Sequence, residues 1–351
     1  MKLSKTLAWL AAALIGAVAS VGVPAQAATA GSLPGSFRWS SSAALVSPHS
    51  NATHNLVAIK DPSVVYYNGR WNVFASTVDN HGSYSMVYFS FTDWSQANSA
   101  TQYYLDQTAI GHGYKTAPQV FYFAPKHLWY LVYQTGGNAS YSTNPDIGNP
   151  SGWTAPKNFY SSMPSIIKQN IGHGYWVDMW VICDSANCYL FSADDNGHLY
   201  RSQTSLSSFP NGFTNTAIAA SDSNPQNLFE ADNVYQVQGG NEYLLVMEAI
   251  GAGGHRYFHS YTSPTINGAW TPLAATASNP FASSANVTFS GTAWTKDISS
   301  GEMIRAGYDQ NLVINPCKIQ YLYQGHDPSA TGGYASLPWR LGLLTQTNST
   351  C

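Results

Sequence analysis

The sequence predicts an all-β protein, a five-bladed β-propeller formed by a single domain. From Gly31 to Cys351, apolar residues recur at every second position in short runs that Gly, Pro, Asn and Asp interrupt, without sustained helical periodicity. These runs also fall into five units of about 58 residues, each long enough for four strands. Four-stranded units repeated at a fixed length are typical of propellers.

The repeat rests on residues of similar type at similar intervals. Aromatic residues close successive units at spacings of 59, 60 and 57 residues, and they are Trp94, Trp153, Phe213 and Trp270. The openings of the five units are assigned to Asp61, Pro118, Asp178, Glu230 and Trp294. A two-sheet sandwich with long loops is the alternative fold, but it does not explain this regularity.

The first residues are interpreted as an export signal. Lys2 and Lys5 precede an apolar stretch, and Ala25-Gln26-Ala27 offers a small-residue cleavage site. We therefore expect a signal peptide at 1–27, a tail at 28–36, a propeller at 37–351, and a secreted, extracellular protein. A membrane anchor is the alternative, but the apolar stretch is interrupted and ends at the cleavage site.

The first unit begins with a polar break and a hairpin. Asn68-Gly69, between two apolar runs, is the strongest two-residue hairpin signal. Before it, Pro62 cannot donate to a sheet ladder and restricts the preceding residue. We expect Asp61 to have an extended backbone at the start of a strand.

Two more acids occupy similar settings. Asp178 lies in Tyr175–Trp180 and Glu230 in Leu228–Ala231, and both runs are apolar or aromatic. A lone carboxylate in such a run costs free energy unless it is used or paired. Asp61, Asp178 and Glu230 each open a unit, so they would converge at one mouth of the channel if the first strand of each blade lines the axis. This convergence favours catalysis over three unrelated turns.

Other acids have simpler explanations. Glu248 and Glu302 are rival catalytic candidates, but pairing with Arg256 or Arg305 would explain them equally well. Asp194-Asp195-Asn196-Gly197 is too short for an EF-hand and is interpreted as a hairpin turn.

Four cysteines in an exported chain indicate two disulfides. Cys183 and Cys188 flank the turn-forming sequence Asp184–Asn187, so they are expected to pair across a hairpin. Cys317 and Cys351 then pair by elimination. Metal ligation is the alternative, but neither pair has a His or second Cys at zinc spacing.

The composition of the chain limits the kinds of molecule that it is expected to bind. Without Lys2 and Lys5, 13 basic residues face 18 acidic ones, a net charge of −5 (13 minus 18), so nucleic acid is not an expected partner. No later stretch is apolar enough to span a membrane. Charged residues form 9% of the chain and aromatic residues 14%. This balance is common in exported proteins that bind neutral sugars, although an aromatic-rich β core has the same composition.

At these residues the chain resembles glycoside hydrolase family 62, which comprises secreted α-L-arabinofuranosidases that act on arabinoxylan. The resemblance extends from about Phe37 to the C-terminus. The stretches that carry it are Ala58–Ser63, Tyr84–Tyr88, Ala117–Val120, Trp176–Trp180, Val246–Gly251 and Leu337–Gly342. The Asp-Pro opening alone is shared with family 43 and other five-bladed glycosidases.

The resemblance implies an inverting mechanism. By matching motif, Asp61 would be the general base, Glu230 the general acid and Asp178 a helper that orients and tunes the acid. Lys60 and Tyr334 would contact the sugar. Inversion requires the base and the acid on opposite faces of the scissile bond, roughly 6.5–9.5 Å apart, with a water beside the base. The acid must be protonated near neutral pH, and a nearby Asp178 anion would favour that state.

Three further residues concern sugar and metal binding. The family implies a calcium ion in the channel, held partly by a His where this chain has Ser300, so calcium is expected to be lost, weakened or held by water alone. No cofactor is expected to be required for the chemistry. Ala335 follows Tyr334 where the family often has Asn, so one xylan contact is expected to be missing. Arg340 is a candidate for binding sugar hydroxyls or for holding a carboxylate near the axis.

The predicted function is a secreted, monomeric, inverting α-L-arabinofuranosidase that releases arabinose from arabinoxylan and its oligosaccharides. Another five-bladed glycosidase, an arabinanase or a β-xylosidase, is the alternative enzyme. A sugar-binding propeller without activity is the alternative that is not an enzyme.

Overall fold

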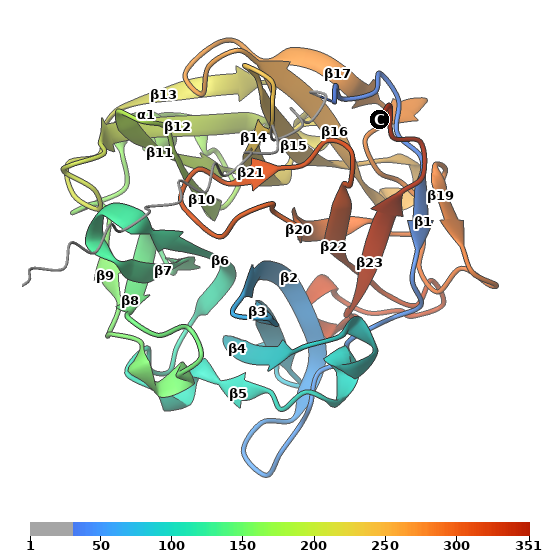
Figure 1. Cartoon of the computed structure of the whole chain (residues 1–351). Coiled ribbons are helices and arrows are strands. Elements are labelled where there is room, and N and C mark those ends of the chain that lie inside the picture. The colour runs from blue at the N-terminus through green and yellow to red at the C-terminus, as the bar shows by residue number, and fades with distance from the viewer. Residues whose placement is uncertain (1–30) are drawn as a thin grey trace, which may run out of the picture.

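The structure is a computed structural model that describes residues 31–351. It confirms the predicted five-bladed β-propeller: five sheets are arranged radially around one axis (Figure 1). No helix within residues 31–351 has the length and apolarity needed to cross a membrane. The predicted signal peptide, residues 1–27, lies outside the described residues.

Each blade runs from an inner strand at the axis to an outer strand at the rim. The first blade contains β2 (Leu56–Tyr67), β3 (Arg70–Asp79), β4 (Tyr84–Phe91) and β5 (Tyr103–Tyr104). The second contains β6 (Lys115–Phe123), β7 (Leu128–Thr135), β8 (Asn138–Asn144) and β9 (Lys157–Asn158). The third contains β10 (Val177–Cys183), β11 (Asn187–Ala193), β12 (His198–Ser205) and β13 (Thr214–Ser221).

The last two blades are more irregular. The fourth contains β14 (Glu230–Val237), β15 (Tyr243–Ile250), β16 (Arg256–Ser263), β17 (Thr271–Thr276) and β18 (Asn279–Pro280), and β21 (Val313–Ile314) runs parallel to β14. The fifth contains β20 (Ser299–Met303), β22 (Gln320–Gly325), β23 (Arg340–Gln346), β1 (Trp39–Ser41) and β19 (Val287–Phe289). The α-helix α1 spans Ser165–Asn170, and short 3-10 helices occupy Trp94–Ser99, Leu105–Gln107, Ala124–Lys126, Pro150–Gly152, Pro225–Asn227, Ala252–Gly254 and Tyr334–Ser336.

The fifth blade closes the ring with a strand from the other end of the chain. β1 pairs antiparallel with β23, which places Trp39 opposite Gln346. In Figure 1, β1 lies beside β23. The expectation of five consecutive units was wrong in this respect. Trp294 also precedes the inner strand of this blade, which begins at Ser299.

The inner strands of the first four blades contain the same irregularity. Each of these strands has one residue with a left-handed backbone, and the pairing with the next strand shifts at that residue. In blade order, the four residues are Asp61 (φ 46°), Ala117 (φ 52°), Asp178 (φ 55°) and Ala231 (φ 54°). Such bulges redirect a side chain away from the regular pleat. The expectation for Asp61 was therefore wrong: it lies inside β2 with a left-handed backbone, because the surrounding ladder outweighs the local preference before proline.

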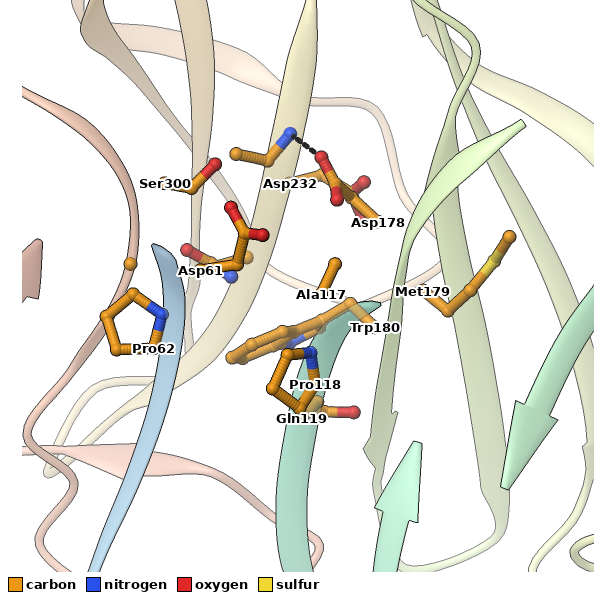
Figure 2. A pocket seen from close by; sticks show the side chains of 13 residues that line it. Asp61, Pro62, Ala117, Pro118, Gln119, Asp178, Met179, Trp180, Asp232 and Ser300 are labelled. Atoms are coloured by element: carbon orange, nitrogen blue, oxygen red, sulfur yellow. Dashed lines mark hydrogen bonds between the residues drawn. The ribbon is translucent and has the colours of Figure 1, made fainter. Parts of the chain in front are cut away.

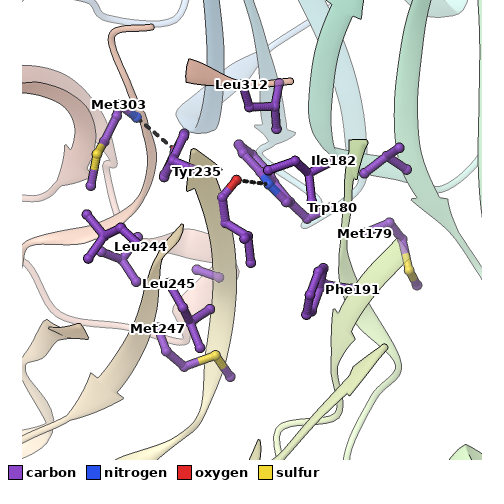
Figure 3. Close-up of a cluster of buried hydrophobic side chains, with 14 of the residues drawn as sticks. Met179, Trp180, Ile182, Phe191, Tyr235, Leu244, Leu245, Met247, Met303 and Leu312 are labelled. Atoms are coloured by element: carbon purple, nitrogen blue, oxygen red, sulfur yellow. Dashed lines mark hydrogen bonds between the residues drawn. The ribbon is translucent and has the colours of Figure 1, made fainter. Parts of the chain in front are cut away.

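The hydrophobic core fixes the blades relative to one another. In Figure 3 the Trp180 ring packs between the third and fourth blades, and its Nε1 donates a hydrogen bond to the Val234 carbonyl at 3.0 Å. Tyr235 Oη accepts one from the Met303 amide at 2.9 Å, which joins the fourth and fifth blades. Close packing of this kind leaves the inner strands little room to move.

The hairpin and disulfide predictions agree with the structure, whereas the ends of the repeating units do not. Asn68 and Gly69 have φ values of 49° and 73°, as a two-residue hairpin requires. Both predicted disulfides are present, Cys183–Cys188 and Cys317–Cys351. The aromatic residues that were expected to close the units lie instead before the fourth strand of each blade, that is before β5, β9, β13 and β17, and they are Trp94, Trp153, Phe213 and Trp270.

Candidate active site

A polar pit opens at one mouth of the central channel, and the three predicted acids meet there. Its wall is formed by Lys60, Asp61, Tyr84, Tyr114, Thr116, Ala117, Gln134, Tyr175, Val177, Asp178, Asp195, Phe229, Glu230, Arg256, Ser300 and Tyr334. A second cavity continues below it along the channel and shares Asp61, Ala117, Asp178 and Ser300 with the pit. Figure 2 shows the Asp61 and Asp178 carboxyl groups and the Ser300 hydroxyl facing the same space.

A ring of inter-blade hydrogen bonds holds the inner strands around this pit. In each blade, one backbone amide of the inner strand donates to a side chain of the preceding blade. The five contacts are Asp61 N to Gln324 Oε1 (2.7 Å), Ala117 N to Ser76 Oγ (2.8 Å), Asp178 N to Gln134 Oε1 (2.7 Å), Ala231 N to Asp178 Oδ2 (2.7 Å) and Ser300 N to Glu248 Oε2 (2.7 Å). The ring satisfies amides that the bulges remove from the ladder.

The junction between the third and fourth blades differs from the others. Elsewhere the acceptor is on the second strand of the preceding blade, at a register position occupied by Ser76, Gln134, Glu248 and Gln324. In the third blade this position is Ala193, which has no side-chain acceptor. The carboxylate of Asp178, from the inner strand, takes its place.

The repeat was also misaligned by one residue in the fourth blade. In the structure, Ala231 occupies the bulge position that Asp61 and Asp178 occupy in their blades. Glu230 is opposite Glu248 in the sheet, just as Lys60 is opposite Ser76, so Glu230 is equivalent to Lys60. Glu230 therefore reaches the pit from the residue before the bulge. The three acids still share one pit although they do not share one backbone position.

Asp61 lies beside a buried ammonium group. Lys60 is 3% exposed, and its Nζ lies 4.2 Å from the centre of the Tyr334 ring. Burial lowers the pKa of Lys60, but Asp61, Tyr334 and Tyr84 together raise it by more, so the pKa lies well above its ordinary value. Lys60 is therefore a fixed positive charge next to Asp61.

Glu230 is held by an arginine that it shares with a second glutamate. Arg256 Nη1 donates to Glu230 Oε1 and to Glu248 Oε1, both at 2.7 Å. Glu248 is fully buried, and burial raises its pKa to about 7 although Arg256 acts in the opposite direction. The Arg256 guanidinium also lies 4.7 Å from the centre of the Phe229 ring.

Asp178 lines the pit near both Glu230 and Asp61. Burial, followed by the nearby Glu230 and Asp61 carboxylates, raises its pKa well above the ordinary value. Its hydrogen bond to the Ala231 amide fixes the backbone directly after Glu230. Asp178 thus affects both the charge around Glu230 and its position.

Asp195 is a pit residue that sequence reasoning assigned only to a turn. The turn is present between β11 and β12, but the Asp195 side chain lines the pit beside Glu230. Burial, followed by the Glu230 and Asp178 carboxylates, raises the pKa of Asp195 to about 9, although Arg256 acts in the opposite direction. The two adjacent aspartates in a short turn gave no signal that separates this role from turn formation.

Other predicted residues lie elsewhere. Arg340 is not part of the pit wall, and its Nη1 donates to the carbonyl groups of Val57 and Trp339. Glu302 and Arg305 form a fully buried ion pair of 2.7 Å. Glu302 and Glu248 are thus both paired with arginines, which is the structural alternative to a catalytic role that the sequence suggested for them.

The channel offers oxygen donors for a hard cation. Both carboxyl oxygens of Asp232 are buried without a hydrogen-bond partner, and this residue lines the channel near Asn233 and Ser300. Carboxylate and neutral oxygen donors are the types that calcium prefers. Within residues 31–351, however, no cluster of three or more His, Cys, Asp or Glu side chains is suitably placed for a metal.

Comparisons with known proteins agree with this architecture. The model of glycosyl hydrolase family 62 matches residues 38–345. Alpha-L-arabinofuranosidase C of Cellvibrio japonicus is 40% identical over 312 residues, 88% of this chain and 47% of that protein. The chain thus spans about half the length of this curated relative.

Solved structures of the same family superpose closely. The catalytic domain of a family 62 α-L-arabinofuranosidase from Coprinopsis cinerea is 65% identical, with a TM-score of 0.89 over 91% of this chain and 100% of that one. A family 62 hydrolase in complex with xylotriose is 54% identical, with a TM-score of 0.86 over 89% and 98% of the two chains. By its sequence from residue 38 to 345 and by its fold, the chain belongs to glycosyl hydrolase family 62.

Proposed function

We propose that the protein is an inverting α-L-arabinofuranosidase that removes arabinose side chains from arabinoxylan. The observation that supports this most directly is the meeting of Asp61 and Glu230, from the first and fourth blades, in one pit of a family 62 propeller. Two carboxyl groups on opposite sides of one sugar are the minimum that inversion requires.

Asp61 acts as the general base. The Gln324 contact fixes its backbone, and the Thr116 hydroxyl lies 3.5 Å from Oδ2. A water beside this carboxylate attacks the anomeric carbon and transfers a proton to Asp61. Lys60, with its fixed positive charge, stabilises the carboxylate that accepts this proton.

Glu230 acts as the general acid on the other side of the sugar. As the bond between the anomeric carbon and the glycosidic oxygen breaks, Glu230 gives its proton to that oxygen, which leaves as a xylan hydroxyl. The products are β-arabinofuranose and a xylan chain with a free hydroxyl group where the arabinose was attached. Exchange with solvent then removes the proton from Asp61 and returns one to Glu230.

The wall of the pit suits a neutral sugar. Its exposed aromatic residues include Tyr114, Tyr175 and Tyr334, which are 44%, 72% and 37% exposed. Aromatic faces pack against the C–H groups of sugars, and phenol hydroxyls bind sugar hydroxyls. A family 62 hydrolase was solved with xylotriose, which supports xylan as the polymer that carries the arabinose.

We further propose that the enzyme is secreted and acts as a monomer. The two disulfides formed in the structure are typical of proteins that fold in an oxidising compartment. Detection of the cleaved chain in culture medium, with the mass of one chain by light scattering, tests both points. Retention in the cell or a larger mass would contradict them.

No cofactor is proposed for the chemistry, since every proton transfer uses a side chain. A calcium ion in the channel would contact Asp232 and complete its shell with water and neutral oxygens. Such an ion would supply positive charge below the pit and stabilise the fold. Calcium is then expected to raise the melting temperature, and less so in Asp232→Asn. Equal melting temperatures of the wild type with calcium and with chelator would contradict this.

The function is tested by product analysis. Wild-type enzyme should release arabinose from wheat arabinoxylan without xylose or arabino-oligosaccharides, and proton NMR should show the β-anomer first. Asp61→Ala and Glu230→Gln should each lower kcat by at least about 10³-fold with an intact circular dichroism spectrum. Initial α-product would contradict inversion, and near-native turnover in either variant would remove that residue from its role.

A further inference from the structure

Four Asn-X-Ser/Thr sequences, which begin at Asn51, Asn138, Asn286 and Asn348, take no part in the pit. Such a sequence is the acceptor of N-linked glycans in exported proteins, and the glycan is attached to the side-chain Nδ2 of the asparagine. An occupied site in a folded protein therefore needs an asparagine at the surface and a nitrogen that the fold does not use. The four asparagines differ in both respects.

Two of the asparagines hold the segment that precedes β1. Asn286 Nδ2 donates a hydrogen bond to the Phe37 carbonyl at 3.0 Å. Asn348 Nδ2 donates one to the Ser36 carbonyl at 2.9 Å. Since β1 closes the fifth blade, both nitrogens help to close the ring. A lost hydrogen bond and a sugar forced against this backbone both cost free energy, so a glycan on either nitrogen would weaken the closure.

The third asparagine is enclosed in the second blade. Asn138 is half-buried at the start of β8, and its Nδ2 donates to the Tyr160 carbonyl at 2.9 Å. Its Oδ1 is buried without a hydrogen-bond partner. The hydroxyl residue of the same sequence, Ser140, is fully buried and donates to Asn158 Oδ1 at 2.7 Å. The folded blade therefore has no place for a sugar at this position.

Asn51 differs from these three. It is exposed in the loop before β2, as is Thr53, the hydroxyl residue of its sequence. Its Oδ1 accepts hydrogen bonds from the Thr53 hydroxyl at 3.0 Å and from the Thr53 and His54 amides at 2.9 and 2.8 Å. Its Nδ2 makes no hydrogen bond within residues 31–351. The loop thus fixes the oxygen of the side chain and leaves the nitrogen unused.

This loop lies beside the entrance to the pit. His54 Nε2 is 3.1 Å from Asp106 Oδ2, which connects the loop to the first blade. Thr53 and His54 line a groove that shares Tyr84 and Tyr114 with the pit wall. A glycan on the loop would therefore stand at the edge of this groove, outside the pit itself.

We propose that, of the four asparagines, Asn51 is the one that carries an N-linked glycan in the folded, secreted protein. The donor is a lipid-linked oligosaccharide of a eukaryotic secretory pathway. Asn51 Nδ2 forms a bond to C1 of the first sugar, the bond between that carbon and the lipid diphosphate breaks, and the nitrogen releases one proton. This inference rests on the proposed secretion but not on the roles of Asp61 and Glu230.

Site mapping tests the proposal on the full-length protein produced in a yeast secretory host. Peptide-N-glycosidase in heavy-oxygen water converts each glycosylated asparagine into a labelled aspartate that mass spectrometry detects. The label is expected at Asn51 in most chains and at none of the other three positions. An unlabelled Asn51, or a label at Asn138, Asn286 or Asn348 in folded protein, would overturn the proposal.

Two exposed threonines supply matched variants. Thr53→Ala destroys the acceptor sequence without changing Asn51 and should abolish the label, whereas Thr53→Ser should keep it. Thr288→Ala makes the same change in the sequence that begins at Asn286 and should leave the labelling pattern and the mass of the glycan unchanged. A label that persists in Thr53→Ala would contradict the assignment.

A second leader separates failure of the acceptor from failure of secretion. Chains from the medium and from the cells are both mapped, with the protein's own residues 1–27 or with a yeast leader in their place. A label at Asn51 that appears only with the yeast leader would support the acceptor while refuting the proposed export signal. An unlabelled Asn51 with both leaders would refute the acceptor. Arabinose release by the same preparations tests the proposed function independently, because the label is read as a mass.

Discussion

The junction between the third and fourth blades differs from the other four around the channel. At those four, the acceptor of the inner-strand amide is a Ser, Gln or Glu side chain from a second strand, outside the predicted catalytic set. At the third-to-fourth junction the acceptor is Asp178 itself, because Ala193 offers none. One carboxyl group therefore joins two blades and adjusts the environment of Glu230. The consequence is that at this junction one predicted catalytic acid also holds the two blades together, whereas elsewhere a different side chain does so.

Substitutions of Asp178 should separate these two roles and give the largest effect. Asp178→Asn keeps an oxygen acceptor for the Ala231 amide, so its free energy of unfolding should stay within about 1 kcal/mol of wild type while kcat falls by about 10²- to 10⁴-fold. Asp178→Ala should lose the same activity and in addition about 1–3 kcal/mol of stability, because the amide is left unpaired. Urea unfolding and initial rates on arabinoxylan measure both. Equal stability of the two variants would show that the junction does not depend on this oxygen.

The fourth-to-fifth junction should make stability depend on pH. Its acceptor, Glu248, has a folded-state pKa of about 7, above the ordinary value of 4.5, so the folded protein binds its proton more tightly than the unfolded chain does. The resulting stabilisation is full below pH 4.5 and is lost as the pH rises through 7, a change on the order of 3 kcal/mol.

Glu248→Gln isolates this contribution. The free energy of unfolding of the wild type should decrease between pH 5 and pH 8, and the decrease should be smaller in the variant. The raised pKa values of Asp178 and Asp195 act in the same direction in both proteins, so some decrease should remain. Parallel profiles would show that Glu248 does not titrate in this range.

The smallest effect is expected from two junctions whose acceptors hold different inner-strand residues. Gln324→Ala and Ser76→Ala each remove the acceptor of one inner-strand amide, that of Asp61 or that of Ala117. Both should cost about 1–3 kcal/mol of stability. Only Gln324→Ala should also lower kcat, by about 10-fold, because Asp61 is the proposed base and Ala117 carries no reactive group. A comparable loss of kcat in Ser76→Ala would indicate a general loosening of the channel.

Local signals in the sequence predicted local structure well. The Asn68-Gly69 hairpin and the disulfides follow from turn chemistry and cysteine spacing, which involve few residues at short range. The unit length of about 58 residues predicted the number of blades. It misaligned Glu230 by one residue, since a bulge changes the register without changing the composition of the strand.

The site was predicted in part. Asp61, Asp178, Glu230, Lys60 and Tyr334 all line the pit. Arg340 does not, because its guanidinium is engaged by backbone carbonyl groups that no sequence pattern identifies. The contact of Arg256 with Glu230 and the place of Asp195 in the pit wall were missed as well, since a charged residue at a strand start and an aspartate in a turn are ordinary features of any β protein.

The sequence alone determined the all-β class, the five units, the disulfide pairing and the three acids, because each depends on residue type and on spacing along the chain. Only the tertiary structure decided that β1 closes the fifth blade, that Asp61 and Asp178 adopt left-handed bulges and that Asp178 replaces the acceptor missing at Ala193. The physical reason is that these features depend on which amides are left unpaired once five sheets meet at an axis. That condition exists only in the folded ring.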